Sequence, residues 1–210
     1  AYMKSEMPYY GVKKPARAKC SKAVIAEHPL DGYEAWRDTA LTLYRGAKKR
    51  EERYAALDLV GHRKYRDYRE RWSSFGMYEE FIVTGAWWDL VDETAVQHIG
   101  RLMQVETAKC TKKMRRWLKD DDMWRRRTSI ICQLKRKQET DTKLLFDAIE
   151  ASMDSKEFFL RKGIGWALRE HGKSDPTAVI RFVKKHESRL SSLSKREALR
   201  RLIKEGHLEH

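Results

Sequence analysis

The helical spacing of apolar residues along almost the whole sequence most constrains the fold. In the segment 31–46, for example, Trp36, Ala40 and Leu43 recur every three to four positions, which places their side chains on one face of a helix. Strand-like alternation of Val, Ile and Thr is absent, and proline occurs only at positions 8, 15, 29 and 176. The sequence therefore predicts an all-α protein.

Short polar breaks, rather than a long linker, separate the expected helices, so a single domain is predicted over residues 1–207. Further helices are expected at residues 86–104, 107–119, 121–137, 139–153, 155–171, 176–187 and 193–204. The last of these has Ser194 and Glu197 at the spacing of a capping box. Many helices of this length joined by short turns indicate either a bundle or an α-solenoid.

The spacing of tryptophans favours the solenoid. Trp88, Trp124 and Trp166 are 36 and 42 residues apart, near the roughly 40–47 residues of a HEAT-like helix pair. The expected architecture is therefore an α-solenoid of HEAT-like helix pairs. Because stacked helix pairs line a concave face, and because the chain is strongly basic, that concave face is expected to be basic.

The charge balance indicates a polyanionic partner. The 210 residues include 45 Lys and Arg against 31 Asp and Glu, which gives a formal net charge of +14 and a pI of about 9.7. Nucleic acid is the commonest polyanion, and an anionic membrane surface is the rival. No apolar run approaches the roughly 20 residues that a membrane span needs, so no membrane partner is expected.

Three cysteines, at positions 20, 110 and 132, lie far apart. Their spacing fits neither a disulfide framework nor a zinc site, so we expect a reducing cytoplasm and no metal. The polar start is unlike a secretory signal. Residues 208–210 are interpreted as the remnant of an expression tag. Because the first residue is Ala, a native segment before it is also expected.

The stretch "TGAWWDLVDE" (84–93) contains the first candidate site residues. On a helix, Trp88 and Asp92 lie four residues apart on one face, beside an expected core stripe of Trp87, Leu90, Val91, Thr94 and Leu102. One interpretation is a boundary Trp beside a solvated or salt-bridged carboxylate. The other is a functional pair, an aromatic wall next to a charge. Asp89 is assigned a structural role, such as a salt bridge.

A second aromatic and charged face is expected on the helix 155–171, where Lys162, Trp166 and Arg169 lie four and then three residues apart. Gly163 and Gly165 remove the side chains beside Trp166, which permits either close helix packing or the close approach of a ligand.

The expected helix 121–137 supplies cations. Arg127 and Lys135 are eight residues apart and would share a face, although a run of Arg is also typical of a plain solvated surface. Further basic clusters at 48–50, 63–71 and 112–116 would add non-specific affinity for a polyanion.

The sequence resembles the AlkD-type DNA alkylation repair glycosylases, which are built from HEAT-like repeats. The matching segments follow the family's order: "YMK" (2–4), "YGVKKPAR" (10–17), "FIVTGAWWDLVD" (81–92), "MWRRRTSIICQLKRK" (123–137), "SKEFFLRKGIGWALREHGKSDP" (155–176) and "LSKREALRRL" (193–202). The resemblance places the family's functional residues on Tyr2, Trp88, Asp92, Arg127, Lys135 and Trp166. The family usually has a helix before the tyrosine motif, which this sequence does not include.

The resemblance implies a cofactor-independent, monomeric DNA glycosylase that acts on double-stranded DNA with alkylated bases. Its substrates would be cationic purines such as 3-methyladenine and 7-methylguanine. Asp92 would then stabilise the oxocarbenium-like sugar and direct water, while Trp88 and Trp166 flank the lesion. Arg127 and Lys135 would hold phosphates beside the lesion. The predicted DNA-binding residues also include Tyr2, from the resemblance, and Lys162 and Arg169, from the charged face of the helix 155–171.

Two other functions fit the same charge and helices. One is a non-catalytic HEAT-like scaffold that binds DNA or RNA through its basic concave surface, but such a scaffold has no need for a carboxylate near phosphates. The other is a protein-interaction platform, which explains the helices but leaves the net charge unexplained.

Overall fold

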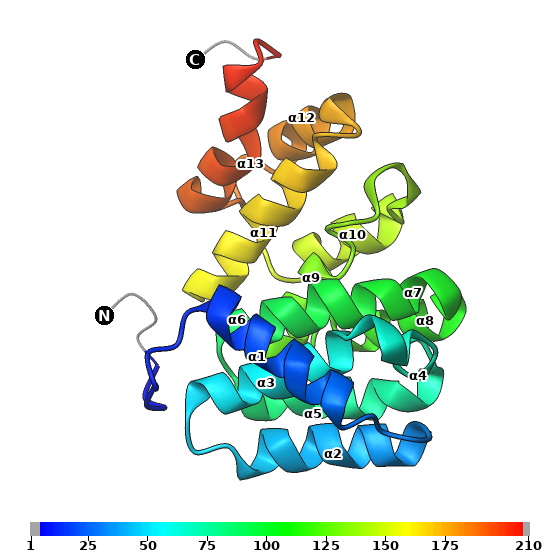
Figure 1. Cartoon of the computed structure of the whole chain (residues 1–210). Coiled ribbons are helices and arrows are strands. Elements are labelled where there is room, and N and C mark those ends of the chain that lie inside the picture. The colour runs from blue at the N-terminus through cyan, green and yellow to red at the C-terminus, as the bar shows by residue number, and fades with distance from the viewer. Residues whose placement is uncertain (1–4, 208–210) are drawn as a thin grey trace. The chain divides into compact units, whose positions relative to one another are not determined.

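Helices make up all the regular structure in residues 5–207, the part of the chain that our computed structural model describes (Figure 1). The Cα trace separates into two compact units, Ala1–Glu106 and Thr107–His210. The prediction of one domain over residues 1–207 stays a prediction. Among the described helices, none combines the length and the apolar character that a bilayer crossing requires.

The first unit contains the packed pair α2 and α3, with α1 also against α3. Its elements are α1 (Lys14–Glu27), α2 (Tyr33–Gly46), α3 (Arg50–Gly61), η1 (Arg63–Tyr65), α4 (Arg66–Arg69), η2 (Trp72–Ser74), α5 (Phe75–Gly85), α6 (Trp88–Glu93), η3 (Thr94–Ile99) and α7 (Gly100–Val105). The core contains Trp36 and Ala40, both from the predicted apolar stripe of α2, together with Phe81. Leu43, from the same stripe, is exposed.

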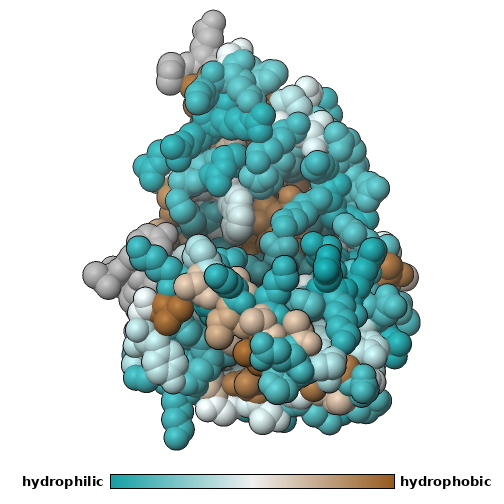
Figure 2. All heavy atoms as spheres, in the orientation of Figure 1, coloured by the Kyte–Doolittle hydropathy of each residue, from teal (hydrophilic) through white to brown (hydrophobic). Residues whose placement is uncertain are grey.

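The second unit contains α8 (Thr107–Trp117), α9 (Met123–Ile131), η4 (Lys137–Glu139), α10 (Thr142–Glu150), α11 (Phe158–His171), α12 (Pro176–Lys185) and α13 (Ser192–Lys204). Side-chain caps start four of these helices, because each cap oxygen accepts a backbone N–H that the helix leaves unpaired. The caps are Asp122, Asp141, Asp175 and Ser191. α11 packs against both α13 and α9, and hydrophilic residues dominate the visible surface over α12 and α13 (Figure 2).

Three predicted details of the helices differ from the structure. Ser191, and not Ser194, caps α13: the Ser191 side chain accepts a hydrogen bond from the backbone N–H of Ser194 at 3.0 Å. The predicted helix 121–137 ends at Ile131, after which the chain forms turns and the short η4. In the predicted helix 86–104, the helical path starts at Trp88 and passes through a π-helical segment, η3, before α7.

Candidate active site

A tight turn positions the start of α6. α5 ends at Gly85, and Ala86 follows in the left-handed region at φ 39°. A side chain at Gly85 would meet the hydroxyl of Tyr44 and, at 3.3 Å, the Cβ of Leu90, so only glycine fits there without displacing them. Trp87 is then extended, at φ −152° and ψ 145°, and α6 begins at the next residue. The α5–α6 junction thus determines where α6 begins in the chain.

Trp88 and Asp92 occupy neighbouring turns of α6, and both are half-buried. Leu90 and Val91 point from the same helix into the core and are fully buried. The aromatic and the carboxylate therefore stand at the edge of the core, as the spacing predicts. Trp87 was expected in the core stripe, and this prediction is wrong: Trp87 precedes the helix, is half-buried and lines a surface cleft.

Asp89 has the structural role that its sequence position suggests. Its carboxylate forms an ion pair with Arg50 of α3 and accepts a hydrogen bond from the hydroxyl of Tyr54. Burial, together with this hydrogen bond, raises the pKa of the Tyr54 phenol well above its usual value, so Tyr54 remains a donor. The first turn of α6 is consequently tied to α3 by charge and by hydrogen bonds.

Arg127 lies in the second unit, and its guanidinium is directed at α11. The residue is 3% exposed, and its Nη1 donates a hydrogen bond to the carbonyl of Phe159. A Cβ at Gly163 would lie 3.0 Å from Nη1, so the glycine makes room for the guanidinium. The side chain of Arg127 therefore makes the close approach that Gly163 permits.

Lys135 does not share a helical face with Arg127. The expectation that it does is wrong, because α9 ends at Ile131 and Lys135 lies in the turn that follows. The side chain of Lys135 is exposed. Its position on an exposed turn leaves it accessible to a large polyanion.

Lys162, Trp166 and Arg169 share one face of α11, as predicted, and that face meets α13. Lys162 Nζ donates to Glu197 at 2.7 Å, and the guanidinium of Arg169 donates to the other oxygen of the same carboxylate. Hydrogen bonding to Lys162 is the main cause that lowers the pKa of Glu197, and Arg169 adds to it against the effect of burial. Trp166, which stands between Lys162 and Arg169 in the sequence, is half-buried.

Gly165 explains how α13 reaches this face. A Cβ at Gly165 would collide with the Cβ of Glu197 and lie 3.0 Å from the carbonyl oxygen of Ser194. Of the two interpretations of the glycines, close helix packing accounts for Gly165, because α13 approaches α11 at this residue.

The structure thus forms two groups of candidate residues, one in each unit. The first is Trp88 with Asp92 on α6. The second is α11, which Arg127 contacts at Phe159 and Gly163 and which carries Lys162, Trp166 and Arg169 on the face that meets α13. Tyr2 lies outside the described residues. Within residues 5–207, no cluster of three or more His, Cys, Asp or Glu side chains could hold a metal ion.

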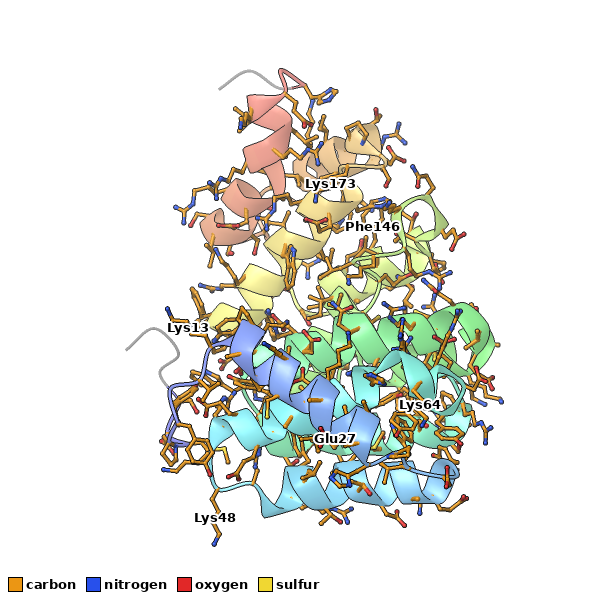
Figure 3. The ribbon with its side chains drawn as sticks, in the orientation of Figure 1. Lys13, Glu27, Lys48, Lys64, Phe146 and Lys173 are labelled. Carbon is orange, nitrogen blue, oxygen red and sulfur yellow. The ribbon has the colours of Figure 1, made fainter. Side chains whose placement is uncertain are left out.

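Sequence reasoning missed Arg50 and its neighbours. Residues 48–50 were interpreted as a basic cluster for non-specific binding, yet Arg50 is 2% exposed and paired with Asp89. Only Lys48 of this cluster is fully exposed, and its side chain extends away from the ribbon (Figure 3). The cluster 63–71 is also partly internal, because Arg69 is buried and donates to the carbonyl of Gly61 at 2.8 Å. The four-residue spacing of Arg50 and Tyr54 places both on one face of a helix, but it does not reveal their shared partner Asp89.

Comparison with known proteins relates the chain to one family. A family model described as DNA alkylation repair enzyme matches residues 1–202. A solved structure, "Predicted DNA alkylation repair enzyme from Enterococcus faecalis", superposes with a TM-score of 0.83 at 27% identity, covering 94% of this chain and 90% of that chain. No curated protein matches.

These matches extend over almost the whole chain and agree with its helical architecture. The predicted fold class, an all-α solenoid, is confirmed by the described helices and by this structural similarity. The basic concave face stays a prediction. The chain belongs to the DNA alkylation repair enzyme family.

Proposed function

We propose that this protein is a monofunctional DNA glycosylase that hydrolyses the N-glycosidic bond of cationic alkylated purines in double-stranded DNA. Its substrates are 3-methyladenine and 7-methylguanine, and it acts as a monomer without a cofactor. The observation that carries the proposal is the pair on α6. The chain belongs to a DNA alkylation repair family, and on α6 the indole of Trp88 and the carboxylate of Asp92 lie one turn apart, both half-buried beside the core.

The chemistry requires little more than this pair. A purine alkylated at N3 or N7 is cationic, so it leaves as a neutral base and needs no proton from a general acid. Positive charge then develops on the deoxyribose. The carboxylate of Asp92 opposes that charge and orients the attacking water, two tasks that a single carboxylate can perform.

The indoles and the cations support the substrate. An indole face attracts a cation with roughly 0.5–2 kcal/mol per contact, so Trp88 and Trp166 would favour a charged lesion over a neutral base. Arg127 and Lys135 would bind backbone phosphates. Lys162 and Arg169, which both form ion pairs with Glu197 in the structure, would do the same.

The decisive measurement is the release of base from a duplex that carries a single 7-methylguanine, with spontaneous depurination subtracted. The Asp92→Asn variant should bind DNA like the wild type but excise at least about 10-fold more slowly, which corresponds to about 1.4 kcal/mol of barrier. Glu93→Gln is the matched control, because it neutralises the next carboxylate on α6, which forms a 3.8 Å ion pair with Lys14.

Three outcomes would count against the proposal. Excision at the wild-type rate by folded Asp92→Asn would remove Asp92 from the mechanism. Binding without any excision by the wild type would leave the non-catalytic DNA-binding scaffold as the function. Comparable release of uracil or hypoxanthine, which are neutral lesions, would require a proton donor and would contradict catalysis by one carboxylate.

A further inference from the structure

A buried ion pair joins α3 to the first turn of α6. Arg50 donates from Nε to Asp89 Oδ2 at 3.1 Å and from Nη2 to Oδ1. The hydroxyl of Tyr54 donates to Oδ2 as well. The side chains of Arg50 and Asp89 are 3% and 11% exposed, so both charges are largely withdrawn from water. We refer to Arg50, Tyr54 and Asp89 as the clamp.

The N-terminal end of α6 has no side-chain cap of its own. α6 is the first part of a helical run that continues through η3 into α7, and Trp87, the residue before it, offers no capping side chain. The first backbone N–H groups of a helix have no acceptor within the helix, so the first turn depends on contacts from outside it to stay ordered. Asp89, the residue of α6 that the clamp holds, lies in this first turn.

The clamp holds α6 at Asp89, which lies between Trp88 and Asp92 in the sequence, so it controls the direction in which these two side chains project. Asp89 immediately follows Trp88, and it precedes Asp92 by three residues, so Asp89 and Asp92 are neighbours on the helix surface. A rotation of α6 that carried Asp89 away from Arg50 would carry Asp92 by the same angle. The buried pairing resists such a rotation, because it would leave an uncompensated buried charge.

The surroundings of the clamp show that packing alone does not hold the α5–α6 turn. Arg50, Arg53 and residues 85–87 line a surface cleft of ≈ 650 Å³. Arg53 spans part of this region by donating from Nη1 to the carbonyl of Thr84 at 3.0 Å. Polar contacts from α3 thus secure a turn that borders an open cleft on one side.

We propose that Asp89, held by Arg50 and Tyr54, is a positioning residue for base excision, because the clamp sets the direction in which Trp88 and Asp92 project. This inference rests on the proposed function. The clamp also neutralises Asp89, which would otherwise be an uncompensated negative charge beside Asp92.

A double-mutant cycle tests the proposal through single-turnover excision of 7-methylguanine. Asp89→Asn should lower the rate by about 10-fold, since small displacements of a reacting group are costly, while DNA affinity stays unchanged. In the Asp92→Asn background the same substitution should change the rate by less than about 2-fold, because Asp89 acts through Asp92. Tyr54→Phe removes one hydroxyl and should give a smaller loss in the same direction.

Glu80→Gln is the matched control. Glu80 accepts two hydrogen bonds from Arg45 of α2, at 2.6 and 2.7 Å, and belongs to α5 rather than to the clamp. Its rate should equal that of the wild type. Equal rate losses from Asp89→Asn in both backgrounds would overturn the proposal, as would a wild-type rate for both Asp89→Asn and Tyr54→Phe.

Hydrogen exchange separates this proposal from the proposed function. If the wild type excises nothing, the proposed function fails, but the clamp can still be tested. Backbone amides of residues 91–93, the first to donate hydrogen bonds within the helix, should exchange faster in Asp89→Asn and in Tyr54→Phe than in Glu80→Gln. Unchanged protection of these amides in both clamp variants would show that the clamp does not hold α6.

Discussion

Glu197 lies between two cations that the proposed function assigns to DNA. Its carboxylate binds Lys162 and Arg169 at once, and its side chain is 13% exposed. A backbone phosphate would therefore have to compete with an internal carboxylate for both partners. At the scale of single residues, Glu197 lowers the positive potential on the face of α11 that carries Trp166.

We therefore expect Glu197→Gln to bind DNA several-fold more tightly than the wild type at low salt, because both cations lose their internal partner. Glu170→Gln is the control, since it also removes one negative charge, but from α11, and it disrupts only the pair with Lys173. Fluorescence anisotropy with a labelled duplex measures both affinities. Equal affinities for the two variants would show that Glu197 does not restrain the cations.

At the scale of elements, α3 secures the segment that leads into α1. The Glu51 carboxylate accepts backbone N–H bonds from Tyr10, Gly11 and Val12, at 3.0, 2.9 and 3.1 Å. Burial raises the pKa of Glu51, but these bonds outweigh it, and the net result is a lowered pKa. A group with a lowered pKa stabilises the fold above its unfolded-state pKa, about 4.3 for Glu, and the contribution disappears as the pH falls through the folded value.

The stability difference between the wild type and Glu51→Gln should therefore be complete at neutral pH and shrink as the pH falls below about 4. Chemical unfolding at a series of pH values measures this difference. Glu27→Gln, at the exposed end of α1 (Figure 3), controls for the change in net charge. A difference that stays constant down to pH values near 2 would contradict anchoring by the ionised carboxylate.

The same elements show what the sequence could predict. Apolar periodicity identified the helices, because burial of one face leaves a repeating pattern whatever the partner is. Helix ends were less predictable. Asp122 and Ser191 are caps, but a capping side chain is chosen by local competition for backbone N–H groups, which periodicity does not report. Arg50 could not be distinguished from a surface cation, because its partner Asp89 is 39 residues away in the sequence.

At the scale of the whole molecule, the net charge of +14 predicts a strong dependence of DNA binding on salt. Log K should fall linearly with log salt concentration, by about 0.9 for each phosphate that the protein neutralises. Lys135→Ala should reduce this slope by about one phosphate equivalent, because Lys135 is exposed on a turn. Titrations between about 50 and about 200 mM salt measure the slope.

Lys173→Ala is the control for this measurement, since it removes one positive charge from an exposed residue that the proposed function does not assign to DNA. Its slope should match that of the wild type. Affinity that does not change with salt would mean that phosphate neutralisation is not the main source of binding. Arg50 pairs with Asp89 and Arg69 donates to the carbonyl of Gly61, so both cations have partners inside the protein. The protein therefore neutralises fewer phosphates than its number of cations suggests.

The π-helical segment η3, between α6 and α7, has a consequence for changes in chain length. In a π-helix each hydrogen bond spans five residues instead of four, so the segment contains more chain per turn than the α-helices on either side. A deletion of one residue within Thr94–Ile99 can therefore tighten the segment into an ordinary α-helix and leave both flanking helices in place. The same deletion inside α6 would shift every later side chain by about 100° around the helix axis. Insertions and deletions that separate related sequences are thus expected to fall in η3, and the spacing from Trp88 to Asp92 is expected to stay fixed.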